Sequence, residues 1–391
     1  MVSQMEFDIV IVGAGPAGST VARKVAAAGF SVLIVDKRQE LGSPIQCSGA
    51  VSRHALLENG VEPDTEFIHE PIYGFKIMNG LGGEKEIDYR KLKPNVYGTQ
   101  EGANPLGYVV DRRRFDRYLL TQAERAGAKA WLKAEAIGYE QAGDDVIISI
   151  KHYNKIERVK TEIIIGADGL RSQVGKWAGI KTHIKLKELA SCLQFVVDGV
   201  ETNGLLELIT GSQTAPGGYG WVFPKGNGYA EIGLGIIAPY TNVNAQVHLD
   251  RFIKNSFLSH RFKNARLLEV QGGGVPLASP LKKQFARNII LVGDAARHVN
   301  PITGGGIHTA LSGGTVAAEF LIKHLPSGDD NSEKNLAEYQ DNWLEAFGNQ
   351  MWKLYDVKKK IFKEKDITIQ DKKLFETMGN YFSPNSDYKK I

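Results

Sequence analysis

Three glycines near the start of the chain, Gly13, Gly15 and Gly18, have a spacing that suits phosphate binding. Gly13 allows a sharp bend, Gly15 lets the backbone approach a pyrophosphate without an intervening Cβ atom, and Gly18 lets a helix pack against the preceding strand. The helix N-terminus would offer free N–H groups and partial positive charge. Asp36 follows about twenty residues later, where a carboxylate would bind a ribose hydroxyl. This pattern predicts a dinucleotide site; the alternative is an ordinary β-α-β turn with Asp36 as a solvated strand end.

A cysteine lies in the loop that comes shortly after this turn. Cys47 is flanked by Gly, Ser and Pro residues over 42–50, which disfavour a long helix or strand. So close to a cofactor site the thiol could act in chemistry, and a purely structural role stays open. The second cysteine, Cys192, has Ala190 and Leu193 as neighbours. We interpret it as a small buried hydrophobic residue.

Three aromatic residues alternate along a short stretch in the second half of the chain. Tyr219, Trp221 and Phe223 precede Pro224, so an extended backbone would place all three rings on one strand face. Such a face could line an apolar substrate site. The alternative is an aromatic core.

Two further apolar stretches end in a glycine and an aspartate. Residues 161–165 lead into Asp168, and 288–292 lead into Asp294. A glycine triplet over 304–306 then offers bare backbone N–H groups at a helix start, which suits a phosphate or an electron-rich ring edge. Three arginines, 112–114, also stand at a helix start, against the helix dipole. An anionic partner could hold one of them, or they form a solvated face.

The elements that position these groups alternate between strands and helices. We expect strands over 7–12, 31–35, 161–165 and 288–292, helices over 21–28, 112–127 and 307–324, and a short meander over 128–160. The tail from Pro326 is predicted to be helical, because aromatic and methionine side chains recur every four residues along one stripe typical of packing. This stripe comprises Tyr339, Trp343, Phe347, Met351 and Tyr355.

The resulting fold class is α/β, with three regions. A discontinuous Rossmann-like domain is expected over 1–71, 106–184 and 274–325. An inserted β-rich substrate domain is expected over 72–105 and 185–273, where glycines punctuate short strands. Residues 326–391 form the helical C-terminal region.

Composition excludes several classes of protein. The 391 residues carry a net charge of +4 with dispersed Lys and Arg, so we expect no nucleic-acid partner. Lysines 358–360 could touch phosphate head groups, but we favour a solvated face. No apolar run approaches the roughly 18 to 20 residues that span a bilayer, so we expect a cytoplasmic protein. Two cysteines cannot form a disulfide framework, a four-cysteine cluster or a zinc ribbon, and no metal site is predicted.

The three glycine-acid motifs, in this order, resemble the FAD-binding pattern of the p-hydroxybenzoate hydroxylase-like flavoproteins. The resemblance implies that Asp168 and Asp294 flank the cofactor, the latter on its ribityl chain, and that the glycine triplet lies by the isoalloxazine. It also implies that Arg112 lies near the cofactor and that Ala136 borders the adenine. The implied FAD-binding residues are Gly13, Gly15, Ala17, Gly18, Asp36, Lys37, Cys47, Ser48, Ala50, Arg112, Ala136, Asp168, Asp294, Gly305, Gly306 and Ile307.

Within this group, residues 43–49 and 219–224 are similar to two signatures of geranylgeranyl reductases, in particular the archaeal digeranylgeranylglycerophospholipid reductases. The resemblance implies saturation of isoprenoid double bonds in ether (phospho)lipid precursors, as in archaeal membrane lipid biosynthesis, with reduced FAD as the hydride source. It implies that the prenyl chain is bordered by Tyr219, Trp221, Phe223 and Pro224. Cys47 and Tyr219 are the implied catalytic residues.

The chemistry of an isolated alkene sets its own requirements. No carbonyl polarises the double bond, so hydride addition needs a proton delivered to the other carbon. The charge that develops resembles a tertiary cation, which aromatic faces could stabilise, and a dry channel would exclude water. We predict Cys47 as the proton donor; Tyr219, His54, His298 and water remain alternatives.

No second strand-Gly-x-Gly-x-x-Gly-helix motif is present, so no dedicated nicotinamide domain is predicted. The flavin would then be reduced by a transient NAD(P)H visitor or by a ferredoxin-type carrier. Peripheral contact with the inner membrane surface is a hypothesis from the implied lipid substrate. A flavin-dependent monooxygenase of the same fold and a non-catalytic flavin- or lipid-binding protein are the competing interpretations.

Overall fold

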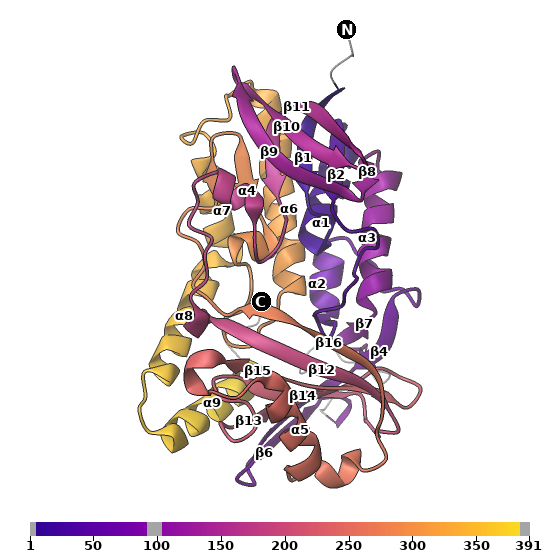
Figure 1. Cartoon of the computed structure of the whole chain (residues 1–391), viewed down its shortest axis with the longest axis vertical. Helices are drawn as coiled ribbons and strands as arrows, with labels where there is room; N and C mark the ends of the chain where they lie inside the picture. Colours follow the sequence, from indigo (N-terminus) through magenta and orange to yellow (C-terminus); the bar gives the residue numbers. More distant parts are fainter. Residues whose placement is uncertain (1–4, 92–103, 384–391) are drawn as a thin grey trace.

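The computed structural model describes residues 5–91 and 104–383. The predicted domains over 1–71, 72–105 and 326–391 include residues 1–4, 92–103 and 384–391, which lie outside the described part. Two large sheets lie at opposite ends of the molecule, and the C-terminal helices run along one side past both (Figure 1).

The first large sheet has parallel strands at its centre, and its strand order is β17-β18-β11-β1-β2-β8. Strand β1 lies between β2 and β11 and is parallel to both. The buried parts of β1, β2 and β11 are continuous apolar runs, which is typical of parallel strands that are covered on both faces. The bounds are β1 (Met5–Val12), β2 (Val32–Asp36), β8 (Lys129–Leu132), β9 (Ala134–Ala142), β10 (Asp145–His152), β11 (Lys155–Gly166), β17 (Phe285–Ala286) and β18 (Ile289–Leu291).

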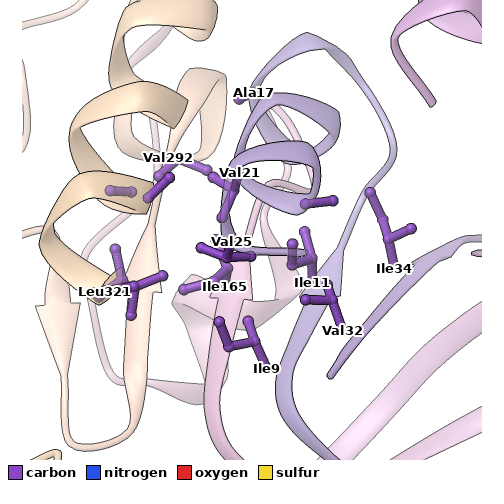
Figure 2. Packing of buried hydrophobic residues seen from close by; sticks show 14 of the residues in the cluster. Ile9, Ile11, Ala17, Val21, Val25, Val32, Ile34, Ile165, Val292 and Leu321 are labelled. Carbon is purple, nitrogen blue, oxygen red and sulfur yellow. The ribbon is translucent and has the colours of Figure 1, made fainter. Parts of the chain in front are cut away.

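Three helices pack against this sheet, and a hydrophobic core lies between the helices and the sheet. Their bounds are α1 (Pro16–Ala27), α3 (Arg112–Arg125) and α6 (Ile307–His324). Figure 2 shows Val25 of α1 and Leu321 of α6 close to Ile165 of the sheet, within one fully buried cluster. The strands and helices predicted around the glycine turns are confirmed, whereas 157–160 and 161–165 form one continuous strand, β11.

The second large sheet is mostly antiparallel, in the order β16-β12-β15-β14-β13-β5-β6. Its strands are β5 (Gly74–Asn79), β6 (Glu84–Asp88), β12 (Leu189–Asp198), β13 (Leu205–Thr210), β14 (Tyr219–Pro224), β15 (Tyr229–Ile237) and β16 (Arg266–Pro276). Helix α5 (Ala245–Asn255) packs on it through Leu249 and Phe252. Strands β12 and β16 cross the middle of the molecule and so face the first sheet's half (Figure 1).

Smaller elements connect the two halves. A three-stranded sheet contains β3 (Ala50–Ser52), β4 (Ile68–Ile72) and β7 (Gly107–Val110). Two short helices, α2 (Arg53–Glu58) and α4 (Gln173–Trp177), follow β3 and β11.

The C-terminal helices pack against both halves. Helix α7 (Ala337–Trp343) continues through a π-helical turn (Leu344–Gly348) into α8 (Asn349–Phe362), and α9 (Ile367–Tyr381) follows. Tyr339 is buried against the first sheet's core, and the α8 and α9 residues Leu354 and Met378 are buried with strands of the second sheet. The stripe is therefore buried packing, apart from its partly exposed end at Tyr355.

Candidate active site

A cavity of about 1020 Å³ is lined by residues of both halves. Its wall includes the turn between β1 and α1, the ends of β2 and β18, and the faces of β12, β14 and β16. The predicted cofactor residues on this wall are Gly13, Gly15, Ala17, Asp36, Lys37, Cys47, Ser48, Arg112, Ala136, Asp168, Asp294, Gly306 and Ile307. The glycine turn and the aromatic strand thus share one cavity.

The turn between β1 and α1 leaves room for a ligand at one glycine and none at another. Gly13 has φ +108°, and a Cβ atom there would lie 2.2 Å from the Ala167 carbonyl oxygen. A Cβ atom at Gly15 would meet no protein atom within 4 Å. No side chain caps the N-terminus of α1. Open backbone beside uncapped N–H groups is the geometry that a pyrophosphate needs.

Asp36 ends β2 and is held by two neighbours. Its Oδ2 accepts from the Ala14 N–H at 2.9 Å, and its two oxygens accept from the Arg38 side chain at 2.9 and 2.7 Å. Burial raises the pKa of Asp36, but the hydrogen bonds and charge of Arg38 bring it below its ordinary value. The ion pair places both an anion and a cation at this end of the cavity. Arg38 was not among the predicted site residues.

Two further aspartates line the wall. Asp168 Oδ2 accepts from the Gln173 and Val174 N–H groups at the start of α4, at 2.6 and 3.1 Å. Its Oδ1 is buried and has no hydrogen-bond partner among the described residues, which fits a ligand donor at this point. Asp294 follows β18, and burial raises its pKa to about 6 while the Arg112 charge opposes that shift.

Cys47 interacts with a cation and with a second thiol. The Arg112 guanidinium pairs with buried Asp116, Nε to Oδ1 at 2.9 Å, and also interacts with the Cys47 thiol. Of the two interpretations of the arginines 112–114, the anionic partner applies to Arg112, and that partner is Asp116 of the same helix. Cys192, which we interpreted as a small buried hydrophobic residue, packs against two apolar clusters but is only partly buried, because it also lines the cavity. Burial raises the pKa of Cys192 to about 12, with a smaller contribution from Cys47.

The aromatic strand presents its rings to the cavity as predicted. Tyr219, Trp221 and Phe223 all line it, with successive ring centroids 5.9 and 6.3 Å apart. The Tyr219 hydroxyl donates to the Thr303 carbonyl next to the glycine triplet, and burial raises its pKa. Pro224 is buried at the strand end, outside the lining.

Several predicted residues lie outside the lining. Gly18 serves packing, because a Cβ atom there would lie 1.9 Å from the Gly13 carbonyl oxygen. Ala50 and Gly305 are also not part of the wall. The alternative proton donors His54 and His298 lie elsewhere. His54 pairs with Glu58 at 2.9 Å, and His298 is buried beside Gln284 at 2.8 Å, where burial lowers its pKa to about 3.

A polar network in the second sheet was not predicted. Gln194 of β12 and Gln271 of β16 line the cavity, and the Gln194 Nε2 donates to the Gln271 Oε1 at 2.6 Å. The same Nε2 donates at 3.2 Å to Glu231, which also accepts from Lys225 at 3.0 Å. Lys358 of α8 also lines the cavity and is buried, so the favoured interpretation of lysines 358–360 as a solvated face is wrong for this residue. A glutamine inside an apolar strand was the available signal, but only the sheet pairing brings the partners together.

Comparison with known proteins decides the family. The model of the geranylgeranyl reductase catalytic domain matches residues 188–275, and that of an NAD(P)-binding Rossmann-like domain matches 11–65. The digeranylgeranylglycerophospholipid reductase of Methanothrix thermoacetophila is 37% identical, over 90% of this chain and 87% of its own. The chain belongs to the digeranylgeranylglycerophospholipid reductase family.

Two further comparisons agree with membership of the digeranylgeranylglycerophospholipid reductase family. Digeranylgeranylglycerophospholipid reductase 2 of Methanosphaera stadtmanae is 35% identical, over 99% of this chain and 94% of its own. The crystal structure of a geranylgeranyl bacteriochlorophyll reductase-like protein from Thermoplasma acidophilum has a TM-score of 0.87 at 30% identity, covering 100% of this chain and 94% of that one. The catalytic-domain match of this family includes β12, β14 and all of β16 except Pro276, and these strands carry the aromatic and glutamine residues of the wall.

Proposed function

We propose that this protein uses FAD to reduce carbon–carbon double bonds in the geranylgeranyl chains of isoprenoid ether (phospho)lipids, as in archaeal membrane lipid biosynthesis. One observation carries the proposal: the open phosphate-binding turn and the aromatic strand line the same cavity. An apolar chain bound along Tyr219, Trp221 and Phe223 would share that cavity with the cofactor. Membership of the digeranylgeranylglycerophospholipid reductase family supports this assignment.

The cavity's own residues fit FAD. Gly15 gives the pyrophosphate open backbone, and the orphaned Oδ1 of Asp168 offers a hydrogen-bond acceptor. We propose that Asp294 and the glycine triplet hold the ribityl chain and the ring, and that Ala136 borders the adenine. When bound, FAD supplies the hydride.

The residues of the chain would handle the proton and the developing charge. We propose that Cys47 donates the proton, since its thiol lies on the cavity wall beside Arg112. The hydrogen bond from the Tyr219 hydroxyl to the Thr303 carbonyl would fix the position of the Tyr219 ring. The face of Trp221 would stabilise positive charge on the substrate carbon.

We also propose the domain division, the reductant and the location. The Rossmann-like and substrate domains would correspond to the two large sheets, joined by the C-terminal helices. NAD(P)H or a ferredoxin-type carrier would reduce the flavin, since the sequence has one dinucleotide turn. The protein would work in the cytoplasm against the inner membrane surface.

Membrane contact has a supporting surface at the connection between α8 and α9. Ile367 and Ile369 are 52% and 44% exposed, and they follow the segment 363–366, which carries two lysines and two acidic residues. The exposed apolar side chains suit a lipid surface, and the exposed lysines Lys363 and Lys365 could contact anionic head groups. None of the helices in the described part of the chain is long and apolar enough to cross a bilayer. Flotation with anionic liposomes at low salt should carry the protein upward, and replacing both isoleucines with aspartate should abolish this.

The central experiment is anaerobic. The purified protein is reduced with dithionite and given a geranylgeranyl lipid, and flavin absorbance and product mass are followed together. We expect flavin reoxidation with mass gains in steps of two hydrogens. A flavin that stays reduced until air enters, with oxygen then found in the lipid, would instead identify a monooxygenase. Failure to bind either flavin or lipid would exclude both.

A further inference from the structure

One charged side chain stands apart from the others on the cavity wall. All other charged residues of the lining belong to the half that contains the first large sheet. They are Asp36, Lys37, Arg38, Arg112, Asp116, Glu135, Asp168, Arg171 and Asp294. Lys358 comes from α8. Among the lining residues in the described part of the chain, it is the only full charge that the second sheet or the C-terminal helices contribute.

Apolar residues from neighbouring segments line the same cavity as Lys358. Phe362 lies four residues further along the chain, Leu374 belongs to α9, and Leu277 comes directly after β16. Lys358 is only 6% exposed, and its Nζ donates to the Leu277 carbonyl. An ammonium group has three N–H donors, so two remain for a ligand.

No ion pair within the described chain satisfies this ammonium group. Glu188 is the one charged group that supports its protonated form, and burial outweighs Glu188 and lowers the pKa of Lys358 to about 8. A buried cation without a close counterion is costly unless a bound anion compensates it. The neighbouring pair Tyr355 and Glu188 is partly exposed, so Lys358 lies just below the surface.

We propose that Lys358 binds the phosphate group of the lipid substrate and so determines the preference for phosphorylated over neutral lipids. This inference rests on the proposed function. An apolar chain along the aromatic strand would then end in an anion at Lys358, the one charged lining residue that the second sheet or the C-terminal helices contribute in the described chain. The position near the surface would let the rest of the head group reach solvent.

Lys358→Gln tests the proposal, with Lys359→Gln as the matched control. Lys359 is the next residue, is exposed, and pairs with Asp356 at 2.8 Å. The two substrates are digeranylgeranylglyceryl phosphate and the corresponding neutral digeranylgeranylglycerol, each assayed for KM, for kcat and for binding to the oxidised holoprotein. We expect Lys358→Gln to weaken binding of the phosphate lipid about 10-fold to 100-fold, as for loss of a charge-assisted hydrogen bond.

The neutral lipid should bind Lys358→Gln and the parent protein equally, and Lys359→Gln should resemble the parent with both. Lys358→Arg should recover part of the preference. Inorganic phosphate should compete with the phosphate lipid in the parent but not in Lys358→Gln. If phosphate alone binds at Lys358 while the lipid preference is unchanged, the site holds a free anion and the proposal is wrong.

Equal loss for both lipids, or a changed flavin spectrum with no change in lipid preference, would also overturn the proposal, since Lys358 would then serve packing or the cofactor. Flavin content and melting temperature establish folding, and Lys358→Met supplies a second neutral variant. A parent protein that prefers the phosphate lipid in binding but reduces neither lipid would contradict the proposed function alone.

Discussion

At the scale of single residues, the site brings together groups that lie far apart in the sequence. Cys47 and Cys192 stand on the same wall, and each perturbs Tyr219 electrostatically. Arg112 interacts with the Cys47 thiol, whereas burial is the main cause of the raised pKa of Cys192. This asymmetry favours Cys47 as the group that moves a proton, because the high pKa of Cys192 makes its thiol a poor acid.

Cys47→Ala should therefore lower the anaerobic single-turnover rate of double-bond reduction by about 10²-fold to 10⁴-fold, the range for loss of a general acid. Cys192→Ala is the control on the same wall and should keep the rate within about 2-fold. Flavin content is measured in both, so that cofactor loss is not mistaken for a chemical effect. A double variant, Cys47→Ala with Tyr219→Phe, that turns over at the parent rate would remove both residues from the mechanism.

At the scale of elements, two glycines in the turn between β1 and α1 meet different requirements. Gly13 is required by the backbone, because its φ is positive and a Cβ atom would clash with Ala167. The fold does not require Gly15, because a Cβ atom there would meet no atom within 4 Å, and we propose that only the ligand requires it. The same turn would then contain a structural glycine and a functional one.

Gly15→Ala should leave the unfolding free energy of the flavin-free protein within about 0.5 kcal/mol of the parent value but weaken FAD binding at least about 10-fold. Gly13→Ala should weaken both, with a stability loss of roughly 1 to 3 kcal/mol from strain and overpacking. Denaturant unfolding of the flavin-free proteins and fluorescence titration with FAD measure the two effects. Normal FAD affinity in Gly15→Ala would contradict the assignment of the pyrophosphate to this turn.

Local patterns predicted the elements that consist of one contiguous run. The strand ending at Val12, the helix from Ile307 to His324 and the aromatic face of β14 all follow from periodicity and turn residues. The network of Gln194 and Gln271 could not be predicted, because antiparallel pairing of β12 and β16 joins positions far apart in sequence. Lys358 shows the same limit, since a triplet of lysines gives no sign that one of them is buried.

At the scale of the whole molecule, stability should depend on pH through a carboxyl group in the second sheet's core. Glu231 is fully buried on β15, and burial raises its pKa to about 7 despite the nearby Lys225 charge, while Glu269 and Asp111 add to the rise. Its Oε1 accepts from Gln194 and Lys225, and its Oε2 has no partner in the described chain. The folded protein therefore holds a proton there that the unfolded chain releases near pH 4.5.

Because the folded state binds the extra proton between these two pKa values, the unfolding free energy should fall as pH rises from 4.5 to about 7 and level off above. Glu231→Gln removes this titration but keeps the acceptor for Gln194. Between about pH 5 and about pH 7.5 the parent should lose about 2 kcal/mol more stability than the variant. Urea unfolding of both proteins across this range provides the measurement, and the other titrating groups cancel in the difference. Parallel pH profiles would mean that Glu231 is already ionised in the folded protein, with Lys225 as its full counterion.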